Sequence, residues 1–108
     1  MKQLILITGG LSGIGLGLVK HYLQRNMHIV IFDIVEFDEL EECLDTLTYQ
    51  LVTGPNVSYF KVNIANNKQV QQSVKQVIEQ LGAPDLVVNC AGILRAGPFD
   101  TLSADDFT

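Results

Sequence analysis

The sequence predicts an α/β protein built on a doubly wound parallel sheet. Four short apolar segments alternate with segments whose apolar residues recur at helical spacing. The first, second and fourth of these segments are largely uninterrupted by polar residues, which is typical of strands buried on both faces. The order βαβαβαβ, with helices as crossovers, implies a parallel sheet with helices on both faces. We expect a single domain over residues 1–108, incomplete at its C-terminal side.

Two strands and two helices of the first half of the chain can be placed by their boundary residues. Gln3–Thr8 is predicted to be a strand that ends at glycines, and Gly13–Asn26 a helix. His28–Asp33 is predicted to be a second strand that ends on a carboxylate. Asp38 and Glu41 form a capping-box pattern, which predicts a second helix. The apolar face of that helix consists of Leu40, Leu44, Leu47 and Leu51.

The second half of the chain repeats this order. Val57–Val62 is predicted to be the third strand, and Asn66 with Gln69 a cap for the following helix. Gly82 ends that helix, since glycine is common just past a helix C-terminus. Asp85–Asn89, "DLVVN", is predicted to be a fourth buried strand.

Composition narrows the class of protein. The chain has 108 residues, 47% hydrophobic content and a net charge of −5, which suits one small soluble domain and argues against disorder. No run of Lys or Arg supports binding to nucleic acid or to an anionic membrane.

Cys43 and Cys90 form no C-x-x-C pair, and His21 and His28 lack a metal-ligand spacing, so no metal site is predicted. The run Leu4–Ile7 is too short for a signal peptide, and we expect a cytoplasmic protein.

The glycine-rich stretch "LITGGLSGIGLG" falls between the first predicted strand and the first helix. In a doubly wound sheet, ligands bind beyond the carboxyl ends of the strands, and this turn is the usual phosphate site. A helix beginning at Gly13 offers unpaired N–H groups and the positive end of its dipole. Gly9, Gly13 and Gly15 would let the backbone approach a pyrophosphate, while Gly10 and Gly17 are predicted to serve helix–strand packing. A glycine turn without a ligand is the alternative.

The spacing of these residues is not G-x-G-x-x-G but T-G-x-x-x-G-I-G, beginning at Thr8. In this it resembles the short-chain dehydrogenase/reductase family. The resemblance implies a Rossmann-like fold, a nicotinamide dinucleotide cofactor and hydride transfer to or from a substrate carbon. It also implies that the cofactor contacts in this turn are Gly9, Leu11, Ser12, Gly13, Ile14 and Gly15.

Asp33 ends the second predicted strand, 18 residues after Gly15. A carboxylate at this place can accept hydrogen bonds from the adenosine ribose hydroxyls. It would also repel a ribose 2′-phosphate, by roughly 4 kcal/mol per unit charge at about 4 Å and an effective dielectric near 20. Neither Gly9–Gly15 nor the adjacent Ile34 and Val35 supplies a compensating cation. We therefore expect NAD rather than NADP, with Asp33 and Ile34 in the site; an exposed strand-end acid is the alternative.

Two further segments match the family in order. Asn63 and Ile64 follow the third strand, where the family has an Asp and a neighbour that bracket the adenine ring. The amide of Asn63 keeps a carbonyl that can accept from the adenine amino group. "NCAG", Asn89–Gly92, resembles the family's N-N-A-G, which implies that Asn89, Ala91 and Gly92 line the ribose. Cys90 replaces the second Asn, and we expect a structural role for its thiol.

The family's acid/base pair, Tyr-x-x-x-Lys, is absent from these 108 residues. Tyr22, Tyr49 and Tyr59 are followed four residues later by Asn, Thr and Asn. No catalytic residue is therefore assigned to this chain. A strand as apolar as Asp85–Asn89 would also be an exposed edge if nothing paired with it. We expect the chain to be the N-terminal part of a longer protein.

Ala91–Phe107, "AGILRAGPFDTLSADDF", is similar to 2,3-dihydro-2,3-dihydroxybenzoate dehydrogenases of siderophore synthesis, which use NAD. The similarity implies that Arg95 could attract a benzoate carboxylate; a solvated loop cation is the alternative. 3-Oxoacyl-carrier-protein reductases and sugar or polyol dehydrogenases remain open, as do a non-catalytic dinucleotide-binding module and a fragment that binds nothing. The expected partners are a small-molecule substrate and further copies of the chain, as in the family's dimers and tetramers.

Overall fold

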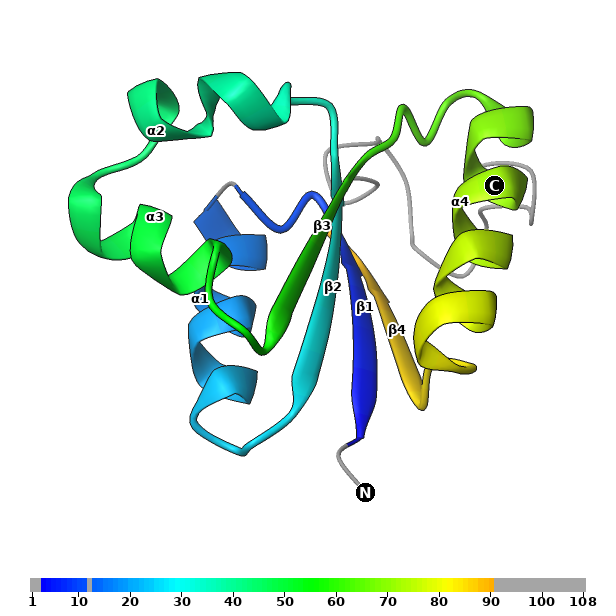
Figure 1. The fold of residues 1–108 in the computed structure, drawn as a ribbon, viewed down its shortest axis with the longest axis horizontal. Coiled ribbons are helices and arrows are strands. Elements are labelled where there is room, and N and C mark those ends of the chain that lie inside the picture. The colour runs from blue at the N-terminus through cyan, green and yellow to red at the C-terminus, as the bar shows by residue number, and fades with distance from the viewer. Residues whose placement is uncertain (1–2, 12, 91–108) are drawn as a thin grey trace.

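A four-stranded parallel sheet lies at the centre of the computed structural model, which describes residues 3–11 and 13–90 (Figure 1). The strands are β1 (Leu4–Thr8), β2 (His28–Asp33), β3 (Val57–Lys61) and β4 (Leu86–Asn89), in the spatial order β3-β2-β1-β4. All three strand pairings are parallel. The predicted fold class is therefore confirmed.

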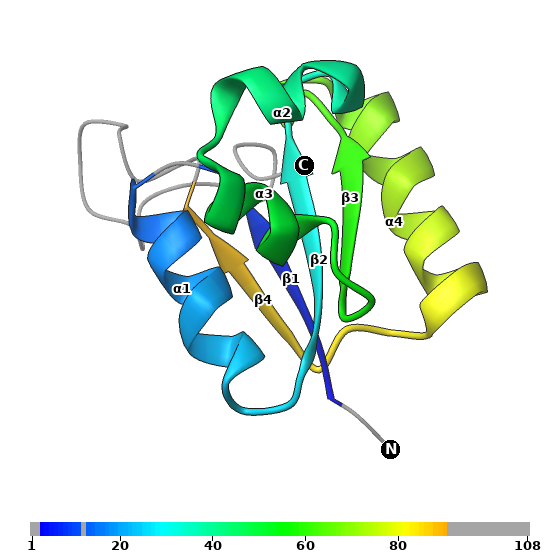
Figure 2. The same ribbon diagram turned by 60° about the vertical axis from the view of Figure 1, so that its left-hand side comes forward.

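Helices cover both faces of the sheet. On one face lie α1 (Gly13–Leu23) and α3 (Thr46–Val52), with α2 (Leu40–Cys43) and the 3-10 helix η1 (Phe37–Glu39) above them in Figure 1. On the other face lies α4 (Asn67–Leu81). The turned view also shows α4 separated by the strands from α1, α2 and α3 (Figure 2). None of the described helices is long and apolar enough to cross a membrane.

Each face of the sheet has its own core. Because successive side chains of a strand point to opposite faces, β1 contributes Leu4 and Leu6 to the α4 side and Ile5 and Ile7 to the α1 side. All five residues of β1 are buried, as the continuous apolar pattern predicts. The sheet thus fixes the position of the strand ends from which the candidate site is built.

The second predicted helix is wrong as a single element. The chain forms η1 and α2, then leaves helical geometry at Leu44, whose ψ is 150°. Asp45 starts α3 instead, because its Oδ1 accepts a hydrogen bond from the Thr48 backbone N–H at 2.8 Å. An aspartate that can cap a new helix competes with continuing the old one, and this ends the helix begun near Asp38.

One helix boundary also differs from expectation. α1 ends at Leu23 rather than Asn26, and Asn26 adopts a φ of 59°, the left-handed conformation that terminates helices. Asn66 caps α4 as predicted, accepting from the Gln69 N–H at 3.1 Å. The Gln69 side chain, however, accepts from the Asn63 N–H at 2.9 Å, so it ties down the β3–α4 turn.

The fourth strand is not buried on both faces. Leu86 and Val87 are 42% and 59% exposed. Among the described strands β4 pairs with β1 alone, so it is a sheet edge. The apolar pattern of "DLVVN" predicted the strand correctly and its burial wrongly, because burial depends on what covers the strand and not on the strand's own residues.

Candidate functional site

The carboxyl ends of the four strands bring most of the predicted site residues to one edge of the sheet. Thr8 lies in register with Phe32 and with Asn89, and Asp33 lies in register with Lys61. Segments more than 80 residues apart in sequence therefore meet at this edge. It is the edge at which ligands bind in doubly wound folds.

The glycine turn after β1 has a conformation that requires glycine at two positions. Gly9 has a φ of 70° and Gly13 a φ of 26°, both in the region that other residues avoid. The Gly9 N–H donates to the Phe32 carbonyl at 2.8 Å, which ties the turn to β2. α1 begins at Gly13, as predicted, so the end of the helix whose first N–H groups lack partners within the helix follows directly on this turn.

Gly15 is a glycine because α1 packs directly on the turn. A Cβ at Gly15 would lie 2.1 Å from the Gly9 carbonyl oxygen. A Cβ at Gly10 would lie 2.8 Å from Ile31 Cγ2, which confirms the predicted packing role of Gly10. The same prediction is wrong for Gly17, which has open space around its Cβ position.

The Asp33 carboxylate is held by two backbone groups. Its Oδ2 accepts from the Leu11 N–H at 3.1 Å, and its Oδ1 accepts from the Ile34 N–H at 2.7 Å. The first of these bonds joins the end of β2 to the glycine turn. Each carboxylate oxygen keeps a further lone pair for a hydroxyl donor. The neighbouring Ile34 is 64% exposed, and Ile14, on the first turn of α1, is 62% exposed.

Asn63 forms a turn of its own after β3. Its Oδ1 accepts from the Ala65 N–H at 3.0 Å, while its backbone N–H donates to Gln69. The oxygen that the sequence assigns to adenine recognition is thus already bonded inside the protein, with one lone pair left. Ile64 packs against the core on the α4 side and is half-buried.

The ends of β1 and β4 are joined through side chains. Thr8 is buried and its Oγ1 donates to Asn89 Oδ1 at 2.7 Å. The Cys90 N–H donates to the Thr8 carbonyl at 3.1 Å. Burial raises the pKa of the Cys90 thiol, so the reactive thiolate is disfavoured, in keeping with a structural role.

Four of the predicted site residues lie outside the described residues, namely Ser12, Ala91, Gly92 and Arg95.

The structure adds contacts that the sequence does not predict, around the segment that follows Asp33. The Tyr59 hydroxyl donates to the Val35 carbonyl, and Lys61 forms an ion pair with Glu36. Burial, followed by the charge of Asp33, raises the pKa of Tyr59. No motif signals these contacts, because they depend on the β2–β3 register.

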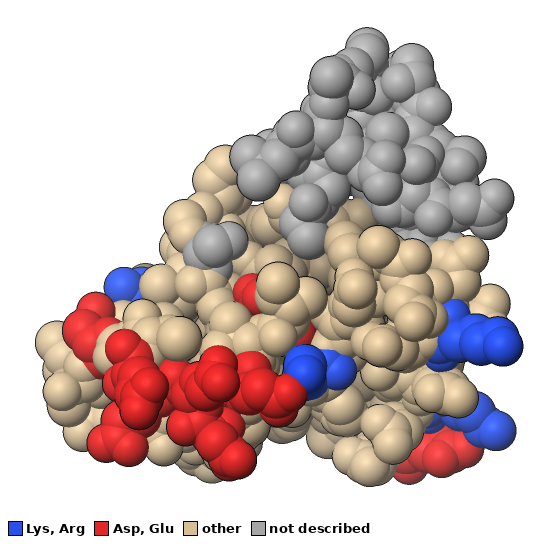
Figure 3. Space-filling view, turned by 90° about the horizontal axis from the view of Figure 1, so that it is seen from above, with Lys and Arg blue, Asp and Glu red and all other residues tan. Residues whose placement is uncertain are grey.

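Negative charge gathers beside the candidate site. Viewed onto the carboxyl ends of the strands, acidic side chains form a patch on one side of the molecule (Figure 3). Six of the twelve Asp and Glu residues of the chain fall between positions 36 and 45. Within residues 3–11 and 13–90, no group of three or more His, Cys, Asp and Glu side chains could hold a metal ion.

Known proteins resemble this chain over most of its length. The family model for short chain dehydrogenases matches residues 3–108. The chain is 31% identical over 103 residues to the 3-oxoacyl-(acyl-carrier-protein) reductase FabG of Chlamydia pneumoniae, covering 95% of this chain and 40% of that protein. It is 32% identical over 93 residues to 3beta-hydroxysteroid dehydrogenase 2 of Eggerthella lenta, covering 85% of this chain and 34% of that protein.

Solved structures agree with the fold. A short chain dehydrogenase from Leptospira borgpetersenii with bound NAD+ superposes with a TM-score of 0.67 at 25% identity, covering 98% of this chain and 37% of that one. ElxO with NADP bound gives a TM-score of 0.69 at 25% identity, covering 98% of this chain and 42% of that one. The chain therefore spans about two fifths of the length of its relatives. With its family model matched almost from end to end, this chain belongs to the short chain dehydrogenase family.

Proposed function

We propose that this chain is the cofactor-binding part of an NAD(H)-dependent oxidoreductase that moves a hydride between nicotinamide and a secondary alcohol or carbonyl carbon. The observation that carries the proposal is the Asp33 carboxylate, held against the glycine turn by the Leu11 N–H. It stands at the end of β2, where a ribose bound beyond the strands presents its hydroxyls. The first turn of α1 lies alongside to receive the pyrophosphate.

The proposed preference for NAD rests on this chain's own residues, because its structural neighbours include one with NAD+ and one with NADP. A 2′-phosphate at Asp33 would meet a carboxylate and the exposed apolar Ile34. It would also approach the acidic stretch at positions 36–45. Like charges in such contact disfavour NADP by several kcal/mol before screening, on the order of 4 kcal/mol at about 4 Å.

Titration with NADH and with NADPH, followed by nicotinamide fluorescence, tests both parts of the proposal. We expect NADH to bind more tightly than NADPH. The variant Asp33→Ala with Ile34→Arg should reverse this order. Glu79→Ala with Ile78→Arg is a matched control, since it makes the same change of charge on exposed residues of α4, on the other face of the sheet. If neither NADH nor NADPH binds, the proposed function is refuted.

For the whole protein we propose a substrate from one of two classes. The similarity of Ala91–Phe107 to dihydro-dihydroxybenzoate dehydrogenases supports a 2,3-dihydro-2,3-dihydroxybenzoate, with Arg95 as the partner of its carboxylate. The relative from Chlamydia pneumoniae, named as a 3-oxoacyl reductase, supports a 3-oxoacyl thioester instead. NAD+ reduction with the first compound, NADH oxidation with the second and a panel of secondary alcohols separate these classes. Binding of NADH without turnover of any of them would favour a non-catalytic dinucleotide-binding module.

A further inference from the structure

Lys61 is the one lysine or arginine that the described part of the chain places in a strand. The others in residues 3–11 and 13–90 are Lys20, Arg25, Lys68 and Lys75, which lie on α1, in the turn after it, or on α4. Lys61 is the last residue of β3 and the register partner of Asp33 at the end of β2. It is therefore the cation best placed to influence a ligand at Asp33.

The reach of Lys61 follows from sheet geometry. Neighbouring strands lie about 4.8 Å apart, and residues in register leave the sheet on the same face. A lysine side chain is longer than this spacing, so its ammonium can reach a group bound at the Asp33 carboxylate. A 2′-phosphate on the ribose would be such a group. The charge and the length that NADP recognition needs are thus present on β3.

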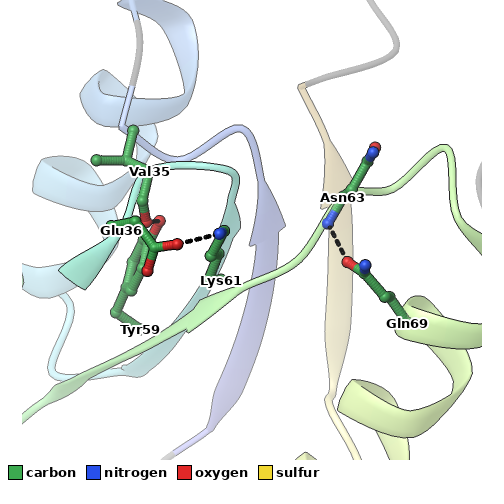
Figure 4. A network of polar contacts seen from close by, with 6 residues as sticks. All are labelled: Val35, Glu36, Tyr59, Lys61, Asn63 and Gln69. Carbon is green, nitrogen blue, oxygen red and sulfur yellow. Dashed lines mark hydrogen bonds and ion pairs between the residues drawn. The ribbon is translucent and has the colours of Figure 1, made fainter.

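Lys61 is nevertheless engaged elsewhere. Its Nζ forms an ion pair with the Glu36 carboxylate, and Figure 4 shows the two side chains pointing toward each other, Glu36 from the segment between β2 and η1 and Lys61 from the end of β3. The Asp33 oxygens accept instead from the backbone N–H groups of Leu11 and Ile34. The two acids therefore have different partners. Glu36 pairs with the Lys61 ammonium, whereas Asp33 is left beside the proposed ligand position.

Glu36 is held in place by the segment around it. The Tyr59 hydroxyl donates to the carbonyl of the preceding residue, Val35, and the Phe37 ring lies 6.3 Å from that of Tyr59, centre to centre. Both contacts fasten the residues on either side of Glu36 to β3. The backbone of Glu36 is consequently held beside β3, from which its carboxylate reaches Lys61.

We propose that Glu36 is a positioning residue for cofactor choice, which withholds Lys61 from a ribose 2′-phosphate. This rests on the proposed NAD(H) function and adds a second element to it. Asp33 repels the phosphate directly, whereas Glu36 removes the cation that would compensate. The side chains of Lys61 and Glu36 are 51% and 56% exposed, so their ion pair contributes little to folding and can be broken without unfolding the sheet.

The test compares dissociation constants for NADH and NADPH in wild-type protein and in Glu36→Gln. We expect NADPH binding to tighten by about threefold to fivefold, the upper part of the range of an exposed charge contact, and NADH binding to change by less than about twofold. Glu36→Asp keeps the charge and should retain much of the wild-type preference. Adding Lys61→Gln to Glu36→Gln should abolish the gain, because the gain requires the freed ammonium.

Glu42→Gln is the matched control, since it removes the same charge from an exposed position of the same acidic stretch. An equal gain in Glu42→Gln, or a gain that survives Lys61→Gln, would overturn the proposal in favour of a general effect of net charge. No gain in Glu36→Gln would also overturn it, while leaving the role of Asp33 intact if Asp33→Ala with Ile34→Arg still reverses the preference. Failure of wild-type protein to bind NADH would instead refute the proposed function.

Discussion

Thr8 and Asn89 are joined by a hydrogen bond of 2.7 Å between Oγ1 and Oδ1, across 81 positions of sequence. They are the last residues of β1 and β4, and they stand in register. The bond closes the sheet at the edge where the candidate site lies. It also fixes the orientation of the side chain that begins the "NCAG" segment.

Replacing Thr8 by Val should destabilise the fold by about 1–3 kcal/mol, because the shape of the buried Thr8 side chain is kept while its hydrogen bond to the half-buried Asn89 side chain is lost. Urea unfolding followed by circular dichroism measures this loss. Thr53→Val is the control, since its hydroxyl donates to the Tyr49 carbonyl at 2.7 Å at an exposed position. Equal losses of unfolding free energy in the two variants would show that the Thr8–Asn89 bond stabilises the fold no more than an exposed hydrogen bond does.

Gly15 and Gly17 should respond oppositely to alanine, although they are two residues apart on the same helix. Gly15→Ala forces a Cβ against the Gly9 carbonyl oxygen and should cost about 1–3 kcal/mol or more. Gly17→Ala meets open space and should stabilise α1 by about 0.5–1 kcal/mol. Thermal unfolding of the two variants provides the comparison. A loss in both would mean that glycine itself, and not the approach of α1 to the turn, is required.

Asp45 should make the stability of α3 depend on pH. The Thr48 N–H, followed by the Thr48 hydroxyl, lowers the pKa of Asp45 below its ordinary value of 3.8. A lowered pKa stabilises the folded state above the ordinary value, and this stabilisation is lost as pH falls through the folded pKa. Asp45→Asn keeps an acceptor oxygen but does not titrate.

The difference in urea midpoint between wild type and Asp45→Asn should therefore be largest near neutral pH and shrink as pH falls from about 5 to about 2. Asp38→Asn, at an exposed acid of the same segment, should show a smaller change over this range. A difference between wild type and Asp45→Asn that stays constant with pH would contradict the proposed cap.

The sheet was predictable from sequence because short apolar runs mark its strands. Leu4–Ile7 in β1 and Ile29–Phe32 in β2 are apolar without interruption, and all of these residues are buried, so pattern and burial agree. The single helix predicted after Asp38 failed for a local reason. Asp45 offers its own cap three residues before Thr48, and a capping pattern does not show which of two competing acids is used.

The candidate site was predictable only where a motif names the residue. Gly13, Asp33 and Asn63 follow from strand ends and spacing, and the structure gathers them at one edge. The ion pair of Lys61 with Glu36 has no such signature. It depends on which residue of β3 stands opposite Asp33, and register is a property of the folded sheet.

The contact between Gly15 and the Gly9 carbonyl has a consequence for binding kinetics. With α1 packed on Gly9 and the Leu11 N–H bonded to Asp33, these described residues of the turn are held by the protein's own contacts. Little conformational entropy is left to lose when an anion arrives, so association needs no slow rearrangement of this loop. Glycine here makes the contact between α1 and the turn rigid, because it allows close packing, although the residue is usually associated with freedom of movement.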